Sequence, residues 1–484
     1  MRRVAFLCLA ALAVTARAEE PPPSGRTIVI RPAKPPTPAL SLRLLPSRAE
    51  QIPGDAAVFY HRAIESLLQV RHREEAEARK AGAAEGAESS DATTAAWLRL
   101  PADKFPREEL RKLLGNRRRA LEEARLGSLR ETCDWGFRHR DEGFDLLLPD
   151  IQEMRWLARW VALNARLDAE EGRIDQALRG LKTGLAAARD VGRGGAYIQS
   201  LVGIACANHV LDAAEALIEQ PGCPNLYWAL AAVPRPLFDL GAATEAETAL
   251  MDQEFPYLGD LDGDAWSLEV ARERGDEIAR RLHALTGDHP GVPSPVTHPT
   301  IARAAQLLAI AKDYRRSKQA LHDAGLPPER IEAMPMVQVV AVDSYRTYRI
   351  RHDDSAKWAY LPFGLTAEGW IKDESTLSDP APGLPVFRVV TPARNVSLAS
   401  TRLQRRIAAL MVVEAVRLYA AEHDGALPAR LDDLTDAPAP PDPITGGPFD
   451  YKVEGDHAVL SGPAPAGWEQ VPEVALRYEL RRAR

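Results

Sequence analysis

Apolar side chains recur three or four positions apart through most of this chain, which is the pattern of helices that bury one face. The first stripe passes through Tyr60 and Leu67. Two further stripes, over residues 151 to 167 and 174 to 188, are separated by Gly172, which suits a turn between helices. The pattern therefore predicts a mainly α protein built from stacked α-hairpins.

The hairpin over residues 157 to 185 resembles a tetratricopeptide repeat, in which two helices pair around a turn. Three in-phase copies at the period of about 34 residues are missing, so we expect stacked α-hairpins rather than a regular solenoid. Residues 197 to 218 are strongly apolar and predict a helix at the centre of the stack. Polar residues such as Asn208 and Asp212 interrupt this stretch, which argues against a membrane span.

The pattern changes from helix to strand near the end of the chain. Residues 400 to 422 carry a helical stripe, and Gly425 after it suits a left-handed helix end. Residues 449 to 453 and 458 to 460 have the composition of two short strands joined by a tight turn. We expect a small α+β module over residues 397 to 484, with a helix followed by a β-hairpin.

This module resembles the C-terminal half of a major pseudopilin of type II secretion. The likeness rests on the order and spacing of Asp442-Pro443, Gly447-Pro448-Phe449 and Tyr451 after the helix. The pilin start, a prepilin-peptidase site joined to a long apolar helix, is missing. Pro463-Ala464-Pro465-Ala466-Gly467 stands where that family has an aspartate-glycine calcium loop. The resemblance therefore implies the fold, but neither filament assembly nor calcium binding.

A longer stretch, from about residue 55 to 463, is similar to a group of uncharacterised exported bacterial proteins of planctomycete type. The likeness is carried by Phe59-Tyr60, Cys133-Asp134-Trp135-Gly136, Leu148-Pro149, the hairpin over residues 157 to 185, Leu201-Val202-Gly203-Ile204-Ala205 and the pseudopilin-like ending. No activity is implied by this resemblance.

Linkers divide the predicted elements into units. Residues 286 to 299, with four prolines, are the best domain boundary. A proline-rich leader that we expect to be mobile precedes the helices, and residues 71 to 96, which are poor in apolar residues, are expected to form a solvated helix end followed by a flexible loop. The predicted units are a signal peptide at 1–18, the leader at 19–48, a helical domain at 49–285, a second helical segment at 300–371 and the pseudopilin-like module at 397–484.

The first 18 residues have the form of a signal peptide. Arg2 and Arg3 precede an apolar run too short to span a bilayer, and Ala16-Arg17-Ala18 offers a cleavage site. Cys8 raises a lipoprotein as the alternative, but the residues before it are too bulky for lipid attachment. We therefore expect a soluble exported protein, in the periplasm or outside the cell, with no membrane span in the mature chain.

The charge balance argues against a nucleic-acid partner. The chain of 484 residues carries 61 Lys and Arg against 68 Asp and Glu, and no strongly basic domain stands out. Export makes disulfides possible, and the mature chain keeps Cys133, Cys206 and Cys223. Cys206 lies too far along its helix to reach Cys223 readily. A bond from Cys133 to either partner and three buried thiols are the open alternatives.

The densest group of reactive side chains follows the first helices. It consists of Cys133, His139, Asp141 and Glu142. A thiol beside an imidazole that a carboxylate orients is the arrangement of a nucleophilic hydrolase. In the structural alternative, Trp135 enters the core, Gly136 permits a turn and the charges face solvent. We favour the structural interpretation, because catalytic partners usually converge from distant parts of a chain.

Two other sets of residues invite ligand binding. His283, His289 and His298 flank the proline-rich boundary, but their spacing fits no tight metal site. Four tryptophans expected at the surface would suit stacking on sugars, namely Trp266, Trp358, Trp370 and Trp468. An aromatic content of 6% instead favours core or interface roles for most of them. We therefore expect no metal and no cofactor.

The chain carries no zinc-protease motif, nucleophile elbow, phosphate loop or Cys-x-x-Cys motif. Stacked helices without a catalytic set most often bind other proteins. The sequence thus predicts a non-enzymatic envelope scaffold or protein-interaction module, with a protein partner in the cell envelope. The alternative is an extracytoplasmic hydrolase that uses the cluster from Cys133 to Glu142.

Overall fold

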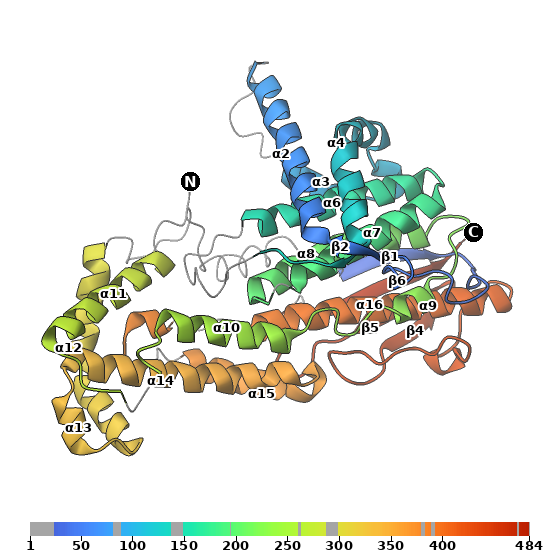
Figure 1. The fold of residues 1–484 in the computed structure, drawn as a ribbon. Helices are drawn as coiled ribbons and strands as arrows, with labels where there is room; N and C mark the ends of the chain where they lie inside the picture. Colours follow the sequence, from blue (N-terminus) through green and yellow to red (C-terminus); the bar gives the residue numbers. More distant parts are fainter. Residues whose placement is uncertain are drawn as a thin grey trace.

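The computed structural model shows a mainly helical protein with a small sheet (Figure 1). It describes residues 24 to 80, 89 to 136, 149 to 193, 195 to 259, 263 to 286, 299 to 378, 383 to 388, 393 to 471 and 474 to 483. Helix accounts for 64% of the structure, so the prediction of a mainly α protein is confirmed. The predicted signal peptide at 1–18 lies outside the described residues.

Three helices form the centre of the larger core. α6 (Pro149–Glu170) and α7 (Ile174–Gly192) make the predicted hairpin, with Gly172 at φ 75° in its turn. α8 (Tyr197–Ile218) packs against both and has the bounds that the sequence predicts. Although α8 is long and apolar enough to cross a membrane, 83% of its most apolar window is buried inside the protein. It is therefore the core helix of the stack.

Glycines let α7 and α8 approach closely. A Cβ on Gly203 of α8 would lie 2.8 Å from the backbone oxygen of Ala188 and 2.9 Å from the Cα of Gly192, both in α7. A Cβ on Gly192 would in turn lie 2.3 Å from the ring of Phe238. A side chain at Gly203 would have to push the two helices apart, and one at Gly192 would have to displace Phe238.

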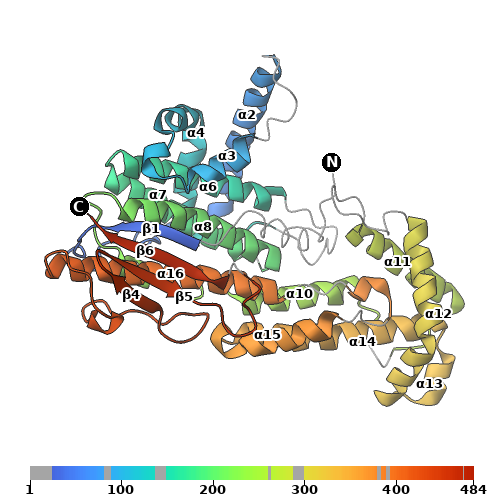
Figure 2. The same cartoon turned by 180° about the vertical axis from the view of Figure 1, so that it is seen from behind.

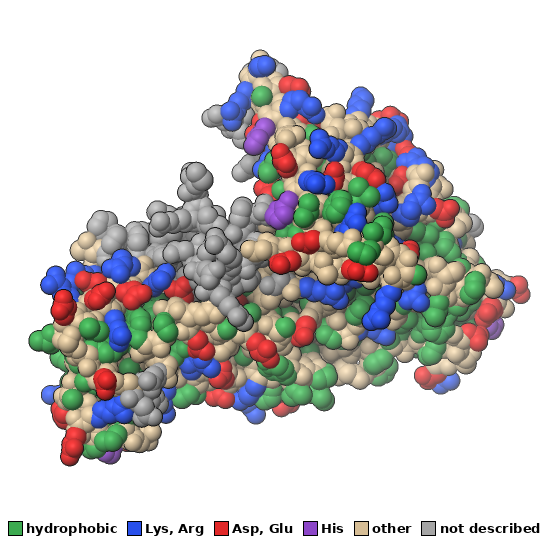
Figure 3. All heavy atoms as spheres, viewed as in Figure 1, with side chains coloured by type: hydrophobic (Ala, Val, Ile, Leu, Met, Phe, Trp, Pro, Cys, Tyr) green, Lys and Arg blue, Asp and Glu red, His purple; other side chains and the backbone are tan. Residues whose placement is uncertain are grey.

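A second hairpin covers one face of this stack. α2 (Ala56–Lys80) packs along α4 (Arg107–Ser128). The strands β2 (Ile52–Asp55) and β3 (Arg130–Thr132) pair in parallel at its open end. On the face seen in Figure 3, basic and acidic side chains are interspersed over α2 and α4.

Of the solvated helix end and flexible loop predicted for residues 71 to 96, the helix end is confirmed, but the loop is wrong for residues 89 to 96. Residues 71 to 80 continue α2, and α3 (Ser89–Trp97) forms the end of the predicted loop, while residues 81 to 88 lie outside the described residues. Arg117, which is buried, holds the end of α2 by a bidentate contact with Glu74. The composition of residues 71 to 96 cannot reveal a contact with Arg117, which lies 43 positions from Glu74.

The sheet contains the predicted hairpin and two further strands. Its order is β1-β6-β5-β4, and its strands are β1 (Ser24–Ile30), β4 (Asp450–Glu454), β5 (His457–Gly462) and β6 (Leu476–Arg482). β4 and β5 pair antiparallel around Gly455, which has φ 68°. The hairpin is therefore confirmed, but the sheet extends past it to β6 and then, in parallel, to β1.

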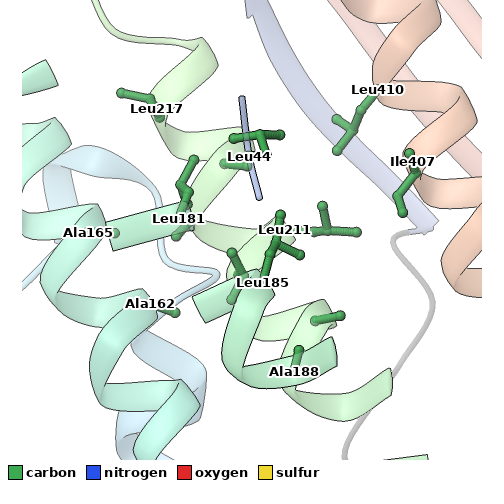
Figure 4. Close-up of a cluster of buried hydrophobic side chains, with 14 of the residues drawn as sticks. Leu44, Ala162, Ala165, Leu181, Leu185, Ala188, Leu211, Leu217, Ile407 and Leu410 are labelled. Carbon is green, nitrogen blue, oxygen red and sulfur yellow. The ribbon is translucent and has the colours of Figure 1, made fainter. Parts of the chain in front are cut away.

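The mobile leader predicted at 19–48 is wrong for residues 24 to 48. Ile28 and Ile30 of β1 are buried, and so is Leu44, which lies beside Leu181 and Leu217 in Figure 4. The backbone N–H of Val29 also donates to Glu219 over 3.0 Å. The buried apolar residues between the prolines anchor the segment to the protein.

α16 (Ala393–Glu422) joins the sheet to the helical stack and begins seven positions before the predicted start at residue 400. Figure 4 shows Ile407 and Leu410 of α16 facing Leu211 of α8, and all three are buried. The helix stops where the sequence predicts, with Gly425 at φ 78°. The short helices α9 (Tyr227–Ala231), η1 (Ala102–Lys104) and η5 (Leu431–Asp433) complete this half.

Figure 2 shows α16 between α8 and the sheet's β5 and β6, and a buried ion network joins these elements. The guanidinium of Arg406 donates to Glu215 over 2.9 Å and pairs with Asp212. Tyr478 of β6 donates to the same Glu215 oxygen over 2.8 Å. Burial by itself would raise the pKa of Asp212, but the nearby guanidinium groups, Arg406 first, outweigh it and lower that pKa.

Most of the remaining helices form a second core at the end of the molecule away from the sheet (Figures 1 and 2). They are the C-terminal part of α10 (Leu240–Glu254), α11 (Leu268–Thr286), α12 (Pro299–Asp323), α13 (Pro328–Ala333), α14 (Met336–Ala356) and η4 (Pro385–Arg388). η3 (Lys357–Tyr360) and α15 (Phe363–Ser378) instead belong to a third cluster, in which Phe363 and Trp370 pack with Tyr197 of α8 and with Trp468. Ile278 and Ala302 share this core although they stand on opposite sides of the predicted boundary at 286–299. The predicted boundary therefore does not separate two cores.

Candidate functional site

The segment after β3 has the structural role that its residues suggest. Trp135 is buried, its ring stacks on Tyr60 with centroids 5.8 Å apart, and its Nε1 donates to the backbone oxygen of Asp190 over 3.0 Å. Gly136 follows at φ 63° and turns the chain. Trp135 thus fixes this segment to α2 and α7.

Cys133 lies beside this tryptophan as a half-buried free thiol. Burial raises its pKa, and the carboxylates of Asp190 and Asp55 raise it further. A thiol in such surroundings stays protonated at neutral pH and is a poor nucleophile. The other three members of the predicted cluster, His139, Asp141 and Glu142, lie outside the described residues.

Asp190, the acid nearest to this thiol, is itself fully engaged. Its two oxygens accept hydrogen bonds from the hydroxyl of Tyr60 at 2.9 Å and from the guanidinium of Arg189 at 2.8 and 3.0 Å. Burial raises its pKa. These contacts tie α2 to α7, so Asp190 acts as a structural acid. Cys206 and Cys223 are also free and buried, so none of the three described cysteines forms a disulfide.

The tryptophans predicted to face solvent are largely inside the protein. Trp266, Trp370 and Trp468 are buried, and Trp468 packs edge-on against Phe363 with centroids 5.2 Å apart. Trp358 is half-buried and donates its Nε1 to Asp373 over 2.8 Å. The surface prediction is therefore wrong, because these rings fill the cores between helices that are remote in sequence.

Metal ligands give no site in the described part of the chain. There, no group of three or more His, Cys, Asp or Glu side chains is arranged to hold a metal ion. Of the three histidines around the proline-rich boundary, His283 belongs to α11, and His289 and His298 lie outside the described residues.

A cavity of about 540 Å³ opens between α14 and the end of α10. Its apolar wall includes Leu258 and Tyr345, and its polar side chains come mainly from α14, at positions 346, 349 and 353. Positions three, four and seven apart share one face of a helix, so these charges converge on the cavity. The spacing was visible in the sequence, but nothing there indicated that α10 would enclose it.

A polar contact between the two helices lines the cavity. Asp252 of α10 accepts hydrogen bonds from the hydroxyl of Tyr345 and from the guanidinium of Arg349. Burial raises the pKa of Tyr345, and its hydrogen bond to Asp252 raises it further. The charges of Asp252 and Arg349 cancel because the two side chains pair, and this pair joins α10 to α14 beside the cavity.

Arg346 and Asp353, which also line the cavity, make fewer contacts within the protein. Arg346 makes no hydrogen bond or ion pair with any described residue, although its charge acts on the pKa of Asp343. Asp353 contacts Nδ1 of His352 at 3.3 Å and lies 3.9 Å from Arg349, but most of its side chain is exposed. Arg346 offers a cation to a ligand, and Asp353 offers an anion.

A second feature is the outward surface of α12, which we term the α12 face. It consists of Ile301, Leu307 and Leu308, with Lys312 and Arg315 beside them. Leu308 is 70% exposed, Leu307 59% and Ile301 48%. The opposite side of the helix is buried in the second core through Ala302, Ala309 and Ile310, so the helix is anchored while these three side chains stay largely exposed.

Comparisons with known proteins identify no relative of this chain. No protein-family model, no curated protein and no solved structure matches the chain significantly.

Proposed function

We propose that this chain is an exported, non-enzymatic protein of the cell envelope that holds a partner protein on the α12 face. The observation that carries the proposal is the apolar stripe of Ile301 and Leu308 on a helix whose other side is locked into a core. Exposed leucines on a rigid surface mark interaction sites, because leaving them in water is unfavourable.

The charges around the stripe indicate the kind of partner. Between Pro299 and Lys318 the exposed ionic side chains of α12 are all basic, and the one acid, Asp313, is buried. Lys312 and Arg315 make no hydrogen bond or ion pair with other described residues. The occupant that fits is an amphipathic helix of a partner protein, with leucine-like residues at its centre and acidic residues at its edge.

The dimensions favour a helix over a membrane surface. From residue 301 to 311 the stripe runs about 15 Å along the axis at 1.5 Å per residue, and it is one or two side chains wide. Helices pack through narrow ridges of this kind. A helix that lies in a bilayer presents a wider apolar face than this stripe offers.

Finer likenesses also support a binding role rather than catalysis. We infer that α6 and α7 are a tetratricopeptide-like hairpin and that residues 397 to 484 are a pseudopilin-like module without filament assembly. What supports the second inference is the order of a long helix, a left-handed stop at Gly425 and an antiparallel hairpin. Export rests on the signal-peptide pattern of residues 1 to 18.

Site-specific photocrosslinking in cells tests the proposal. A photoreactive residue at Leu308 should give a discrete adduct with another protein, and the same residue at Leu365, an exposed leucine of α15, should not. The crosslinked peptide should map to an acidic amphipathic helix. A synthetic copy of that helix should bind the purified full chain at least about tenfold more tightly than it binds the double variant Lys312→Glu, Arg315→Glu.

Three outcomes would contradict the proposal. The first is that both positions give identical adducts, and the second is that the only adduct is with a second copy of this chain. The third is that no protein adduct forms, while the chain sediments with phosphatidylglycerol vesicles and Leu308→Glu abolishes this sedimentation. The second outcome would indicate self-association, and the third a membrane surface.

A further inference from the structure

We propose that the cavity between α10 and α14 binds a short peptide with free termini, about three residues long. In this site Arg346 holds the peptide carboxylate and Asp353 holds the peptide ammonium. The inference is independent of the α12 face, because no residue of α12 lines the cavity.

The spacing of the two charges sets the length of the ligand. Arg346 and Asp353 are seven positions apart on α14, so they lie on one face of the helix, about 10.5 Å apart along its axis. An extended chain spans at most about 3.3 to 3.6 Å per residue, so three residues cover this distance. The volume of about 540 Å³ falls within the range of pockets that enclose small molecules.

The part of the cavity between these charges suits a side chain without charge. Ile350 lies between the two ends on the same helix and is 47% exposed, and Leu258 stands opposite, in the segment after α10. The ionic groups near the centre, Asp252 and Arg349, already neutralise each other. A peptide with an apolar or small middle residue would therefore lose no hydrogen bonds there.

Charge pairing gives the site its specificity for a zwitterion. A guanidinium binds a carboxylate through two parallel hydrogen bonds, which is the strongest contact available to a peptide C-terminus. Burial lowers the pKa of His352, so the histidine beside Asp353 is neutral at neutral pH and leaves the charge of that carboxylate available to an ammonium group. A ligand with only one of the two charges would satisfy only half of the site.

Calorimetric titration of the full mature chain with defined peptides tests the inference. The probes are Ala-Leu-Ala, its N-acetylated form and its C-terminal amide. The free tripeptide should bind, and each blocked form should bind at least about tenfold more weakly, which corresponds to the loss of one charged contact. Wild-type protein without measurable preference for the free peptide would overturn the proposal.

Variants assign each terminus to its residue. Arg346→Gln should remove the preference for the acid over the amide, and Asp353→Asn should remove the preference for the amine over the acetylated form. Asp354→Asn and Lys112→Gln are matched controls, because both residues are exposed and neither lines the cavity. These controls should leave binding within twofold of wild type.

Binding that survives both cavity variants would place the peptide elsewhere and refute the site. Circular dichroism shows whether each variant is folded. If a variant does not fold, the series of blocked peptides on the wild-type protein still decides the question. Loss of partner crosslinking at Leu308 would leave this result untouched, so failures of the two proposals are distinguishable.

Discussion

Arg406 of α16 donates a hydrogen bond to Glu215 of α8 over 2.9 Å, although the two residues are 191 positions apart. Both are buried, and the same guanidinium also contacts the backbone oxygen of Asn208 at 3.1 Å. Since a buried charge is costly without a partner, this contact fixes how α16 lies on the helical stack. The C-terminal module is therefore an integral part of the larger core.

Replacing Arg406 by leucine should strongly destabilise the protein. The change leaves Asp212 and Glu215 buried with fewer compensating charges, and breaking such a network lowers the free energy of unfolding by about 3 to 5 kcal/mol. Urea unfolding measures the difference. Arg125→Leu is the control, because its pair with Glu122 is exposed and should be worth less than about 1 kcal/mol. Equal effects of the two changes would contradict the structural role of the network.

A methyl group at Gly203 should separate α7 from α8. Gly203→Ala places its Cβ 2.8 Å from the backbone oxygen of Ala188, and overpacking of this kind costs about 1 to 3 kcal/mol. Gly115→Ala in α4, where nothing lies within 4 Å, should instead stabilise the protein by about 0.5 to 1 kcal/mol. Thermal unfolding of both variants should therefore shift in opposite directions.

The N-terminal strand should contribute to the stability of the whole protein. Ile28→Ala removes a fully buried side chain from β1 and should lower the free energy of unfolding by about 2 to 5 kcal/mol. Thr27→Ala, at an exposed position of the same strand, is the matched control and should change it by less than about 1 kcal/mol. If both variants unfold at the same urea concentration as wild type, β1 is not anchored in solution.

Acid should destabilise the second core through His352. Burial lowers the pKa of this histidine, and Arg349 adds to that effect, whereas its hydrogen bond to Asp353 opposes it. The unfolded chain therefore takes up a proton near pH 6.5 that the folded chain does not. The contribution to stability is complete above about pH 6.5 and falls by up to about 1.4 kcal/mol per pH unit below it.

His352→Gln should remove this part of the pH dependence. The measurement is the free energy of unfolding of wild type and variant from pH 7.5 down to 5, compared as slopes rather than as absolute values. Parallel curves would show that His352 is protonated equally in the folded and the unfolded chain.

Cys133 should react slowly in the native protein. Because burial and nearby carboxylates raise its pKa, little thiolate is present at pH 8, and alkylation should be much slower than in the urea-unfolded chain. Mass spectrometry of iodoacetamide-treated protein locates the label. Native alkylation of Cys133 faster than that of a free cysteine would revive the hydrolase hypothesis.

The elements of this fold are largely local in origin. The stripes of α6, α7 and α8 follow from a 3.6-residue period, and the turns follow from Gly172 and Gly425, which adopt positive φ. The hairpin of β4 and β5 follows from short apolar runs around Gly455. These features depend on residues a few positions apart, so the sequence by itself determined them.

The candidate sites depend on how distant segments meet. Asp252 and Tyr345 are 93 positions apart, and nothing in either helix indicates that they enclose a cavity together. The same holds for β1, which the sequence places in a proline-rich leader, whereas the structure pairs it with β6. Side-chain periodicity shows which face of an element is apolar, but not which element covers it.

The sequence alone therefore determined most of the helices and the β-hairpin, and it also indicated that α8 is a buried core helix. Only the tertiary structure decided that Trp468 is buried, that Leu308 is exposed and that Arg406 meets Glu215. The physical reason is that exposure and charge pairing are properties of the folded neighbourhood, whereas helix and turn formation are set mainly by neighbours in the chain.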